Sequence, residues 1–294
     1  MTAQLRSPPA DAELQLTEAD FARIARIAKA GWGLNLDSAK RPLIRSRLGR
    51  RLKALNLATF DPYCEIIESG DVVECDHFIS ALTTNVTHFY REAHHFELLE
   101  ADVLPELVAR ARKGQRVRLW SAGCSSGQEP YSLAGSVLAL AKDAASLDLR
   151  ILATDVDPLV LETAEGGRYD AQSCVFPSPA LEDRLFPKAP STPEAFRTIR
   201  PELKPLITFR RLNLMQPWPF SGRFDVILCR NVAIYFDKPT QNRLWTRFSE
   251  NLHDGGSLLI GHSERITAPA EHALQVIGIT AYRKTGPVPS NAPR

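Results

Sequence analysis

The chain has 294 residues, of which 44% are hydrophobic, 24% charged and 8% aromatic. This composition excludes a disordered chain, a collagen-like repeat and a coiled coil along most of the length. The length suits two domains, or one α/β domain with an appendage. A formal net charge of +2 excludes a molecule that is basic as a whole, so any basic patch must be local.

Five cysteines are spread along the chain without a CxxC pair. This spacing indicates neither a zinc site nor a disulfide framework, and we expect no metal. The first fifteen residues lack the apolar core of a signal peptide, and no segment approaches the roughly 20 apolar residues that span a bilayer. We therefore expect a protein of the reducing cytoplasm that does not insert into a membrane.

Residues 1–82 show helical patterns only. Thr17, followed by acidic residues, predicts the N-cap of an amphipathic helix that buries Phe21, Ile24, Ile27 and Ala28. A second predicted helix begins near Pro42 and carries its apolar residues on one face: Leu43, Ile44, Leu48 and Leu52. Shorter helices are predicted at 58–69 and 72–82. The pattern predicts an all-helical N-terminal domain.

Beyond Arg116, short apolar runs alternate with helical patterns, which is typical of an α/β domain with a largely parallel sheet. The predicted strands are 117–120, 149–154, 207–212, 225–229 and 257–261. The predicted helices are 94–112, 129–142, 157–166 and 239–253. Residues 171–205 break this rhythm with seven prolines and no glycine, so we expect an insertion there.

The turn after the first strand has the composition of a binding loop. Gly123 and Gly127 are followed by a predicted helix that starts near Glu129. The spacing is not that of dinucleotide folds, and no Gly-Lys-Ser/Thr follows, which disfavours pyrophosphate. A carboxylate at Glu129 favours a cationic ligand instead. The alternative is an ordinary tight βα turn.

Polar residues follow the next strands at the same predicted edge of the sheet. Asp155 suits two ribose hydroxyls, whereas Asp157, which precedes Pro158, suits an N-cap. Asn213 is equally consistent with an adenine contact and with a turn residue. Arg230 and Asn231, between a strand and the next helix, are candidates for the floor of a site.

The segment from Lys40 to Lys53 holds seven Lys or Arg residues and no acid. One interpretation is a solvated helix face. The other is a docking surface for an acidic helix, formed by Arg41, Arg45, Arg47 and Arg51. Nucleic acid is disfavoured as the partner because no aromatic residues interleave with these charges.

Five segments together resemble the chemotaxis receptor glutamate methyltransferases, which methylate glutamates of membrane chemoreceptors with S-adenosyl-L-methionine and release S-adenosyl-L-homocysteine. These segments are TTNVTHFYREAHHF at 83–96, LWSAGCSSGQEPYSLA at 119–134, ILATDVD at 151–157, FDVILCRNVAIYFDK at 224–238 and LLIGHSE at 258–264. The matches occur in order across residues 20–285. The resemblance implies a helical receptor-recognition domain (1–82), a Rossmann-like methyltransferase domain (83–294) and a small β-subdomain inserted at 171–205.

The resemblance also implies functions for individual residues. Arg91 and Tyr235 would face the methyl transfer, and His94 and His95 are expected to be structural, since adjacent helix residues do not face one target. The implied cofactor contacts are Asn85, Thr87, Arg91, Glu129, Asp155, Asn213, Leu214, Arg230 and Asn231. We also expect the protein to be a monomer that is recruited to receptor clusters at the membrane.

Three other functions remain open from the sequence. A cofactor-binding regulator could lack Arg91 or Tyr235, but both are present. A nucleic-acid methyltransferase commonly carries an Asn/Asp-Pro-Pro-aromatic motif, where this chain has Arg230-Asn231-Val232-Ala233. A structural adaptor would use the N-terminal domain alone. Some family members bind a receptor C-terminal peptide on the β-subdomain, and the prolines of 171–205 disfavour such an added strand.

Overall fold

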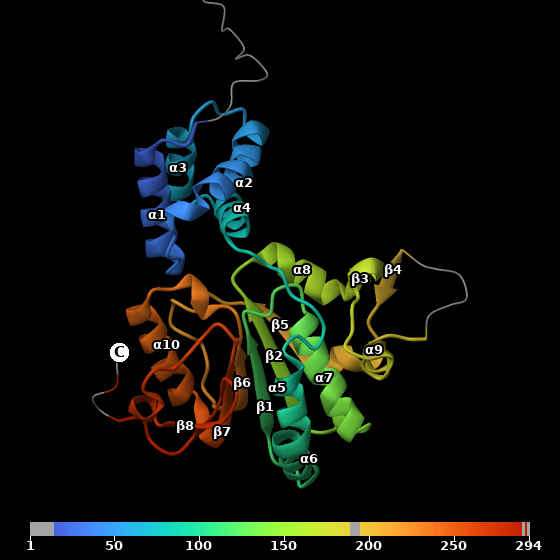
Figure 1. Ribbon diagram of the computed structural model, residues 1–294. Helices are drawn as coiled ribbons and strands as arrows, with labels where there is room; N and C mark the ends of the chain where they lie inside the picture. The colour runs from blue at the N-terminus through green and yellow to red at the C-terminus, as the bar shows by residue number, and fades with distance from the viewer. Residues whose placement is uncertain (1–14, 189–194, 290–291, 293–294) are drawn as a thin grey trace, which may run out of the picture. The chain divides into compact units, whose positions relative to one another are not determined.

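The computed structural model describes residues 15–188, 195–289 and 292 (Figure 1). The chain divides between Thr84 and Asn85 into two compact units. None of the helices in the described residues is long and apolar enough to cross a bilayer.

The first unit is helical, and its core is the one that the apolar spacing predicts, except that Ile27 is only half-buried and Leu43 is exposed. Thr17 caps α1 in a reciprocal pair with Asp20, which confirms the predicted N-cap. Ile44, Leu48 and Leu52 are buried, but Leu43 is 44% exposed, so its assignment to the buried face was wrong. The unit consists of α1 (Glu18–Trp32), α2 (Arg41–Ala54), α3 (Phe60–Glu68) and α4 (Val72–Leu82).

The basic helix α2 uses several of its arginines inside this unit. Arg51 forms an ion pair with the buried carboxylate of Glu74. Arg47 donates to the carbonyls of Ala81 at 3.1 Å and Thr83 at 2.6 Å, at the end of α4. Arg41 pairs with Glu18 of α1. Three of the four predicted docking arginines therefore hold helices together, which corrects the expectation that all four are available to an acidic helix. Arg45 is exposed.

The second unit is built on a mixed sheet of seven strands in the order β5-β2-β1-β6-β7-β9-β8. The first five strands in this order are mutually parallel, and β9 and β8 run antiparallel at the end. The strands are β1 (Val117–Ala122), β2 (Leu149–Asp155), β5 (Ile207–Arg211), β6 (Phe224–Cys229), β7 (Leu252–Ile260), β8 (Leu274–Gly278) and β9 (Ala281–Lys284). The five predicted strands are confirmed, while β8 and β9 were not predicted.

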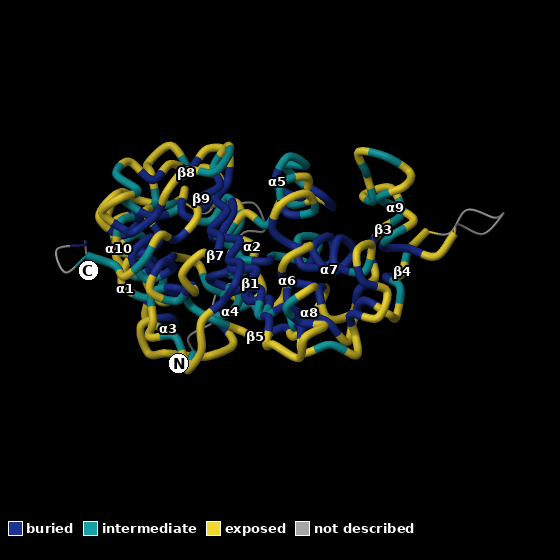
Figure 2. Tube along the Cα trace, turned by 90° about the horizontal axis from the view of Figure 1, so that it is seen from below, coloured by how far each residue is buried: buried dark blue, intermediate teal, exposed yellow. Residues whose placement is uncertain are grey.

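Helices cover the two faces of this sheet unequally. Leu119 and its neighbours on one face pack into a core with α6 (Leu104–Arg112) and α7 (Gln128–Leu140). On the other face, Trp120 packs against Phe248 of α10 (Lys238–Glu250) and Trp218. No helix follows β5, so residues 212–223 pass to β6 without one. Figure 2 shows β1 and β7 buried within the unit, whereas the outward sides of α10 and α8 (Pro158–Gly166) are exposed.

Two predicted segments differ from their expected form. The helix predicted at 94–112 is divided into α5 (Ala93–Leu98), a π-helical turn (Leu99–Val103) and α6. The insertion contains α9 (Pro179–Leu185) and a two-stranded sheet of β3 (Arg168–Asp170) and β4 (Phe196–Thr198). Its first strand begins before residue 171, and each strand has three residues, so the β-structure is smaller than expected. Pro190 and Pro193 lie outside the described residues.

Candidate active site

The parallel strands end at one edge of the sheet, and the polar residues singled out above follow them. The direction of strand order reverses between β1 and β6. From β1 the chain continues to β2 and β5 on one side of the sheet, and then β6 and β7 extend the sheet on the other side of β1. Ligands of open α/β sheets bind outside the carboxyl ends of the strands at such a reversal. The candidate site is therefore assigned to the loops after β1, β2 and β6.

Two glycines allow the loops of this edge to approach one another. Gly123 has a φ of 83°, and an added Cβ would lie 2.3 Å from Cγ2 of Val232, in the loop after β6. At Gly261, directly after β7, an added Cβ would lie 2.5 Å from the backbone nitrogen of Asn231. A side chain at either glycine would push the loops apart, so the glycines set the spacing of the site.

Asp155, the last residue of β2, is held by backbone donors. Its carboxylate accepts hydrogen bonds from the N–H of Ser125 at 2.8 Å and from the N–H of Asp157 at 3.0 Å. Asp157 caps α8 through the N–H of Leu159, as predicted, and also accepts from Nδ2 of Asn85 at 2.8 Å. Asn85, Ser125, Asp155 and Asp157 thus form one cluster across three segments.

Burial has the largest effect on the pKa of Asp155, which is 7% exposed. Burial and the neighbouring Asp157 raise its pKa to about 6, although backbone N–H groups partly oppose this rise. The carboxylate is ionised at neutral pH, but its pKa lies only about one pH unit below 7. A ligand that donates to it would favour the charged form.

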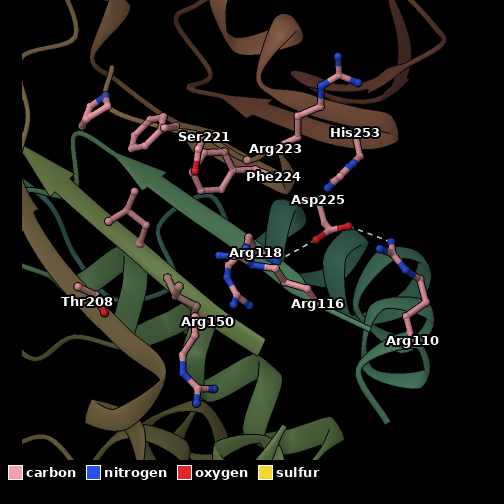
Figure 3. A pocket seen from close by; sticks show the side chains of 15 residues that line it. Arg110, Arg116, Arg118, Arg150, Thr208, Ser221, Arg223, Phe224, Asp225 and His253 are labelled. Carbon is pink, nitrogen blue, oxygen red and sulfur yellow. Dashed lines mark hydrogen bonds and ion pairs between the residues drawn. The ribbon is translucent and has the colours of Figure 1, made fainter. Parts of the chain in front are cut away.

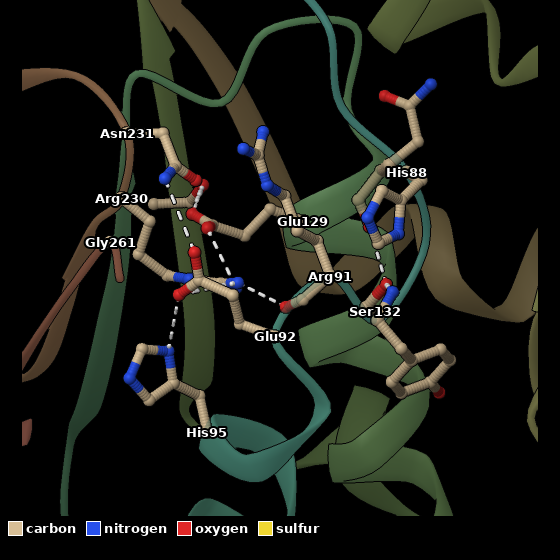
Figure 4. A network of polar contacts seen from close by, with 12 residues as sticks. His88, Arg91, Glu92, His95, Glu129, Ser132, Arg230, Asn231 and Gly261 are labelled. Atoms are coloured by element: carbon tan, nitrogen blue, oxygen red, sulfur yellow. Dashed lines mark hydrogen bonds and ion pairs between the residues drawn. The ribbon is translucent and has the colours of Figure 1, made fainter. Parts of the chain in front are cut away.

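A second cluster surrounds the buried side chain of Arg230, which follows β6. Its guanidinium lies 3.3 Å from the carboxylate of Glu129 and 3.5 Å from that of Glu92 (Figure 4). It also donates to the carbonyl of Arg91. Glu129 accepts from the hydroxyl of Ser121 at 2.6 Å. One arginine thus links the loop before α5, the start of α7 and the end of β6.

The two carboxylates that contact Arg230 respond differently to burial. Burial raises the pKa of Glu129 above its usual range, and Arg230 opposes that rise. For Glu92, burial is outweighed by hydrogen bonds from His262 and Asn231 and by the charge of Arg230, which lower its pKa to about 2. Glu92 is therefore ionised throughout the physiological pH range, whereas Glu129 depends on a neighbouring cation to stay ionised.

His94 and His95 lie beside this cluster. Their ring centroids are 4.2 Å apart, and ligand atoms of both lie within 4.8 Å of a Glu92 oxygen, so the argument that they do not face one target was wrong. Nε2 of His95 contacts the carbonyl of Ile279 at 3.1 Å, and burial lowers its pKa to about 4. Arg230 supplies the positive charge that Glu92 requires, so we assign no metal to this cluster.

Glu264 is a site residue for which the sequence suggested no role. Its buried carboxylate accepts from the backbone N–H groups of Gly261 at 2.5 Å, Asn231 at 3.1 Å and Ile234 at 3.3 Å. This holds Asn231 in the left-handed region at a φ of 60°, an unfavourable conformation that surrounding structure must stabilise. The segment LLIGHSE contained the residue but gave no signal of these contacts.

The remaining predicted site residues occupy the same edge with different local roles. Arg91 donates through Nη1 to the carbonyl of Val86 at 2.8 Å, and Tyr235 is half-buried in a 3₁₀ turn. The side-chain oxygen of Asn213 accepts from the N–H of Met215, as a turn residue does. Leu214 is buried, and Thr87 is half-buried. Their contacts with a ligand stay predictions.

Two of the five free cysteines also belong to this edge. Cys124 lies in the loop after β1, and Cys229 is the last residue of β6. Both are buried, and burial raises the pKa of each thiol well above its usual range.

Comparison with known proteins identifies the family. Residues 19–83 match the CheR methyltransferase all-alpha domain, and residues 85–283 match the CheR methyltransferase SAM binding domain. The chain belongs to the CheR methyltransferase family. The resemblance drawn from the sequence motifs is confirmed, and the second unit is an S-adenosyl-L-methionine-binding methyltransferase domain of Rossmann-like fold.

Individual members of the CheR methyltransferase family align over most of the chain. A probable chemotaxis protein methyltransferase of Rhizobium etli is 48% identical over 254 residues, which cover 86% of this chain and 95% of that relative. The chemotaxis protein methyltransferase of Klebsiella aerogenes is 40% identical and covers 86% of both chains. That of Escherichia coli is 39% identical and covers 92% of both chains.

The residues at the strand ends fit the cofactor of this family. S-Adenosyl-L-methionine carries an ammonium, a carboxylate and a ribose diol. The side chain of Glu129 is 12% exposed, and a cation would favour its ionisation. Nε of Arg230 is a buried donor without a hydrogen-bond partner among the described residues. Asp155 is an acidic residue at the end of a parallel strand, as are the carboxylates that bind ribose hydroxyls in dinucleotide folds. The donor set therefore matches the chemistry of the ligand.

Proposed function

We propose that this methyltransferase esterifies glutamate side chains of membrane chemoreceptors in chemotactic adaptation. The observation that carries the proposal is the 48% identity with a probable chemotaxis protein methyltransferase over 95% of that relative. The chemistry of the site supports it, because a glutamate with a pKa of about 4.3 is ionised at neutral pH and requires no general base.

We infer that Glu129, Arg230 and Asp155 bind the cofactor, with Asn85, Thr87, Asn213, Leu214 and Asn231 completing its surroundings. The cofactor supplies an electrophilic methyl group when bound. Arg91 and Tyr235 would orient the receptor carboxylate at the methyl group, since alignment is the main requirement of an in-line displacement. A tight ion pair from Arg91 to the nucleophile would stabilise the ground state more than the transition state, so positioning is the role that we assign to it.

The helical unit is proposed to recognise the receptor. Arg45, Arg50 and Lys53 are exposed on α2, whereas Arg41, Arg47 and Arg51 contribute to the surface from half-buried positions. A positive helix face is complementary to an acidic receptor helix. The protein would then act as a monomer in the cytoplasm, at receptor clusters, with neither nucleic acid nor membrane insertion in its function.

The proposed activity is tested by incubation with radiolabelled S-adenosyl-L-methionine and receptor-containing membranes, followed by alkali. We expect label on the receptor that alkali releases as methanol, because carboxyl methyl esters hydrolyse readily whereas N-methyl groups do not. Alkali-stable label, or label on nucleic acid instead of the receptor, would contradict the proposal.

Tyr235→Phe tests the positioning role at the reacting centre. Loss of one hydroxyl hydrogen bond is worth about 0.5–1.5 kcal/mol, so kcat is expected to fall by up to about tenfold. The Kd of S-adenosyl-L-homocysteine, measured by calorimetry, should stay unchanged. Full turnover by the phenylalanine variant would leave Tyr235 a packing role only.

Receptor recognition is tested by charge reversal at Arg45 and Arg50, two exposed residues of α2. We expect the receptor KM to rise about tenfold at low salt, and the difference to shrink as salt screens charges over about 8–10 Å. Lys113→Glu with Lys142→Glu, exposed positions of the second unit, is the matched control for net charge. Equal KM values for both double variants would favour a merely solvated helix face.

A further inference from the structure

A cavity of about 650 Å³ opens at the edge of the sheet opposite to the candidate active site. It lies among the amino-terminal ends of β1, β2, β5 and β6 (Figure 3). Its basic residues are Arg110, Arg116, Arg118, Arg150, Arg223 and His253. Neither the proposed methyl transfer nor the recognition of a receptor uses this group.

The missing helix after β5 explains why the cavity exists. Arg118 lies two residues before Trp120, so both side chains point to the face that α10 covers. Trp120 is covered by Phe248 and Trp218. Nearer the amino-terminal ends of β1 and β2, this face borders the cavity.

Positive charge predominates in the cavity, and part of it lies on neighbouring strands. Arg118 and Arg150 are direct neighbours in the parallel pairing of β1 and β2, and like charges in such positions repel one another. Asp225 bonds Arg110 at 2.9 Å, and Asp148 bonds Arg118 at 2.5 Å.

The other guanidiniums of the cavity are compensated more weakly, because Asp148 acts on Arg116 and Arg150 without forming an ion pair with either. Within the described part of the chain, no ion pair joins Arg116, Arg150 or Arg223 to a carboxylate. Five arginines thus face the two carboxylates of Asp148 and Asp225, so the cavity keeps an excess of positive charge.

Two of the guanidiniums are fixed in place by the backbone. Nη1 of Arg150 donates to the carbonyls of Leu147 and Leu149, both at 2.7 Å, and Nη1 of Arg118 donates to the carbonyl of Val117 at 2.7 Å. Among the described residues, no partner is recorded for Nη2 and Nε of Arg150. Guanidinium groups held in this way lose little freedom when they bind phosphate oxygens.

The wall that faces these arginines is aromatic. Phe220 is half-buried and Phe224 is buried, and the ring of Phe224 lies beside Ser221 and Arg223 in Figure 3. Arginines together with the half-buried ring of Phe220 suit a ligand with phosphates and a planar base, and the volume suits a small molecule. We propose that this cavity binds a nucleotide that carries two or more phosphate groups, with its phosphates on Arg116, Arg150 and Arg223 and its base against Phe220.

The test is calorimetry on the full-length protein with four probes: GTP, ATP, inorganic pyrophosphate and guanosine. We expect a nucleoside triphosphate to bind with a micromolar Kd, at least tenfold more tightly than pyrophosphate or guanosine, and more weakly at higher salt. Arg116→Glu with Arg223→Glu should weaken that binding at least tenfold, and the glutamine pair should weaken it less. Lys142→Glu with Arg243→Glu, two exposed positions outside this cavity, is the control matched in net charge and should bind as the unaltered protein does.

Each variant must also bind S-adenosyl-L-homocysteine with unchanged affinity, because the cavity and the candidate active site lie at opposite edges of the sheet. The proposal would be overturned by no binding of either triphosphate, equal binding of pyrophosphate, insensitivity to the double reversal, or displacement of the nucleotide by S-adenosyl-L-homocysteine. Displacement by a short DNA duplex would overturn it in favour of nucleic acid.

Discussion

Replacing Arg230 by methionine is expected to destabilise the methyltransferase unit by about 3–5 kcal/mol, the usual effect of removing one partner from a buried ion pair. The guanidinium lies between Glu92 and Glu129, and its side chain is 2% exposed. Without it, the two buried carboxylates would repel one another. Urea unfolding followed by tryptophan fluorescence measures the effect, since Trp120, Trp218 and Trp245 all lie in this unit.

Two further measurements separate charge from lost packing at Arg230. Adding Glu129→Gln to the methionine variant should restore part of the stability, because one stranded charge is removed. The single variant should also regain stability as pH falls, since its buried carboxylates would titrate above their unfolded-state pKa and the penalty disappears once they are protonated. A methionine variant of unaltered stability would show that the arginine does not compensate these carboxylates.

Asp155→Asn is expected to weaken binding of S-adenosyl-L-methionine and of S-adenosyl-L-homocysteine ten- to a hundredfold. The reason is the loss of a charge-assisted hydrogen bond, worth roughly 1.5–3 kcal/mol. Because the pKa of Asp155 is raised to about 6, the unaltered protein should lose affinity as pH falls through 6, while the asparagine variant should show no such step. Calorimetry between pH 5 and 8 measures both quantities.

The control for Asp155 is Asp170→Asn, an exposed aspartate that caps a short turn outside the candidate site. Linkage gives a second signature for Asp155. Its folded-state pKa lies above the usual 3.8, so its contribution to stability is lost as pH rises from about 4 to 6. The asparagine variant should lack this loss. Equal affinity of both variants for the cofactor would remove Asp155 from the site.

The parts of the fold that the sequence predicts are those with strong local signals. Buried parallel strands are continuous apolar runs, so β1, β2 and β6 are recognisable without tertiary information. Thr17 and Asp157 are recognisable as caps because their bonds reach only two or three residues along the chain. By contrast, β8 and β9 are short strands at the end of the sheet, and exposed Val276 and buried Tyr282 give no clear run.

In the candidate site, too, the residues with local sequence signals could be predicted and those with distant partners could not. Glu129 and Asp155 follow strand and turn patterns, so the residues themselves suggest a ligand. Glu92 depends on partners that are distant in sequence: Asn231 is 139 residues away and His262 is 170 residues away. No local pattern encodes such contacts. The docking face of α2 was overestimated because the partners of Arg47 and Arg51 are distant in sequence, on α4 or directly after it.

The buried thiols of Cys124 and Cys229 have a consequence for chemical selectivity. A thiolate is a far better nucleophile than a carboxylate towards a methyl sulfonium, so an ionised cysteine beside the cofactor would methylate itself. Burial raises the pKa of both thiols and keeps them protonated, and a protonated thiol is a poor nucleophile. With the cofactor bound at this edge as proposed, the burial of these two thiols would reserve the methyl group for an anion that arrives from outside.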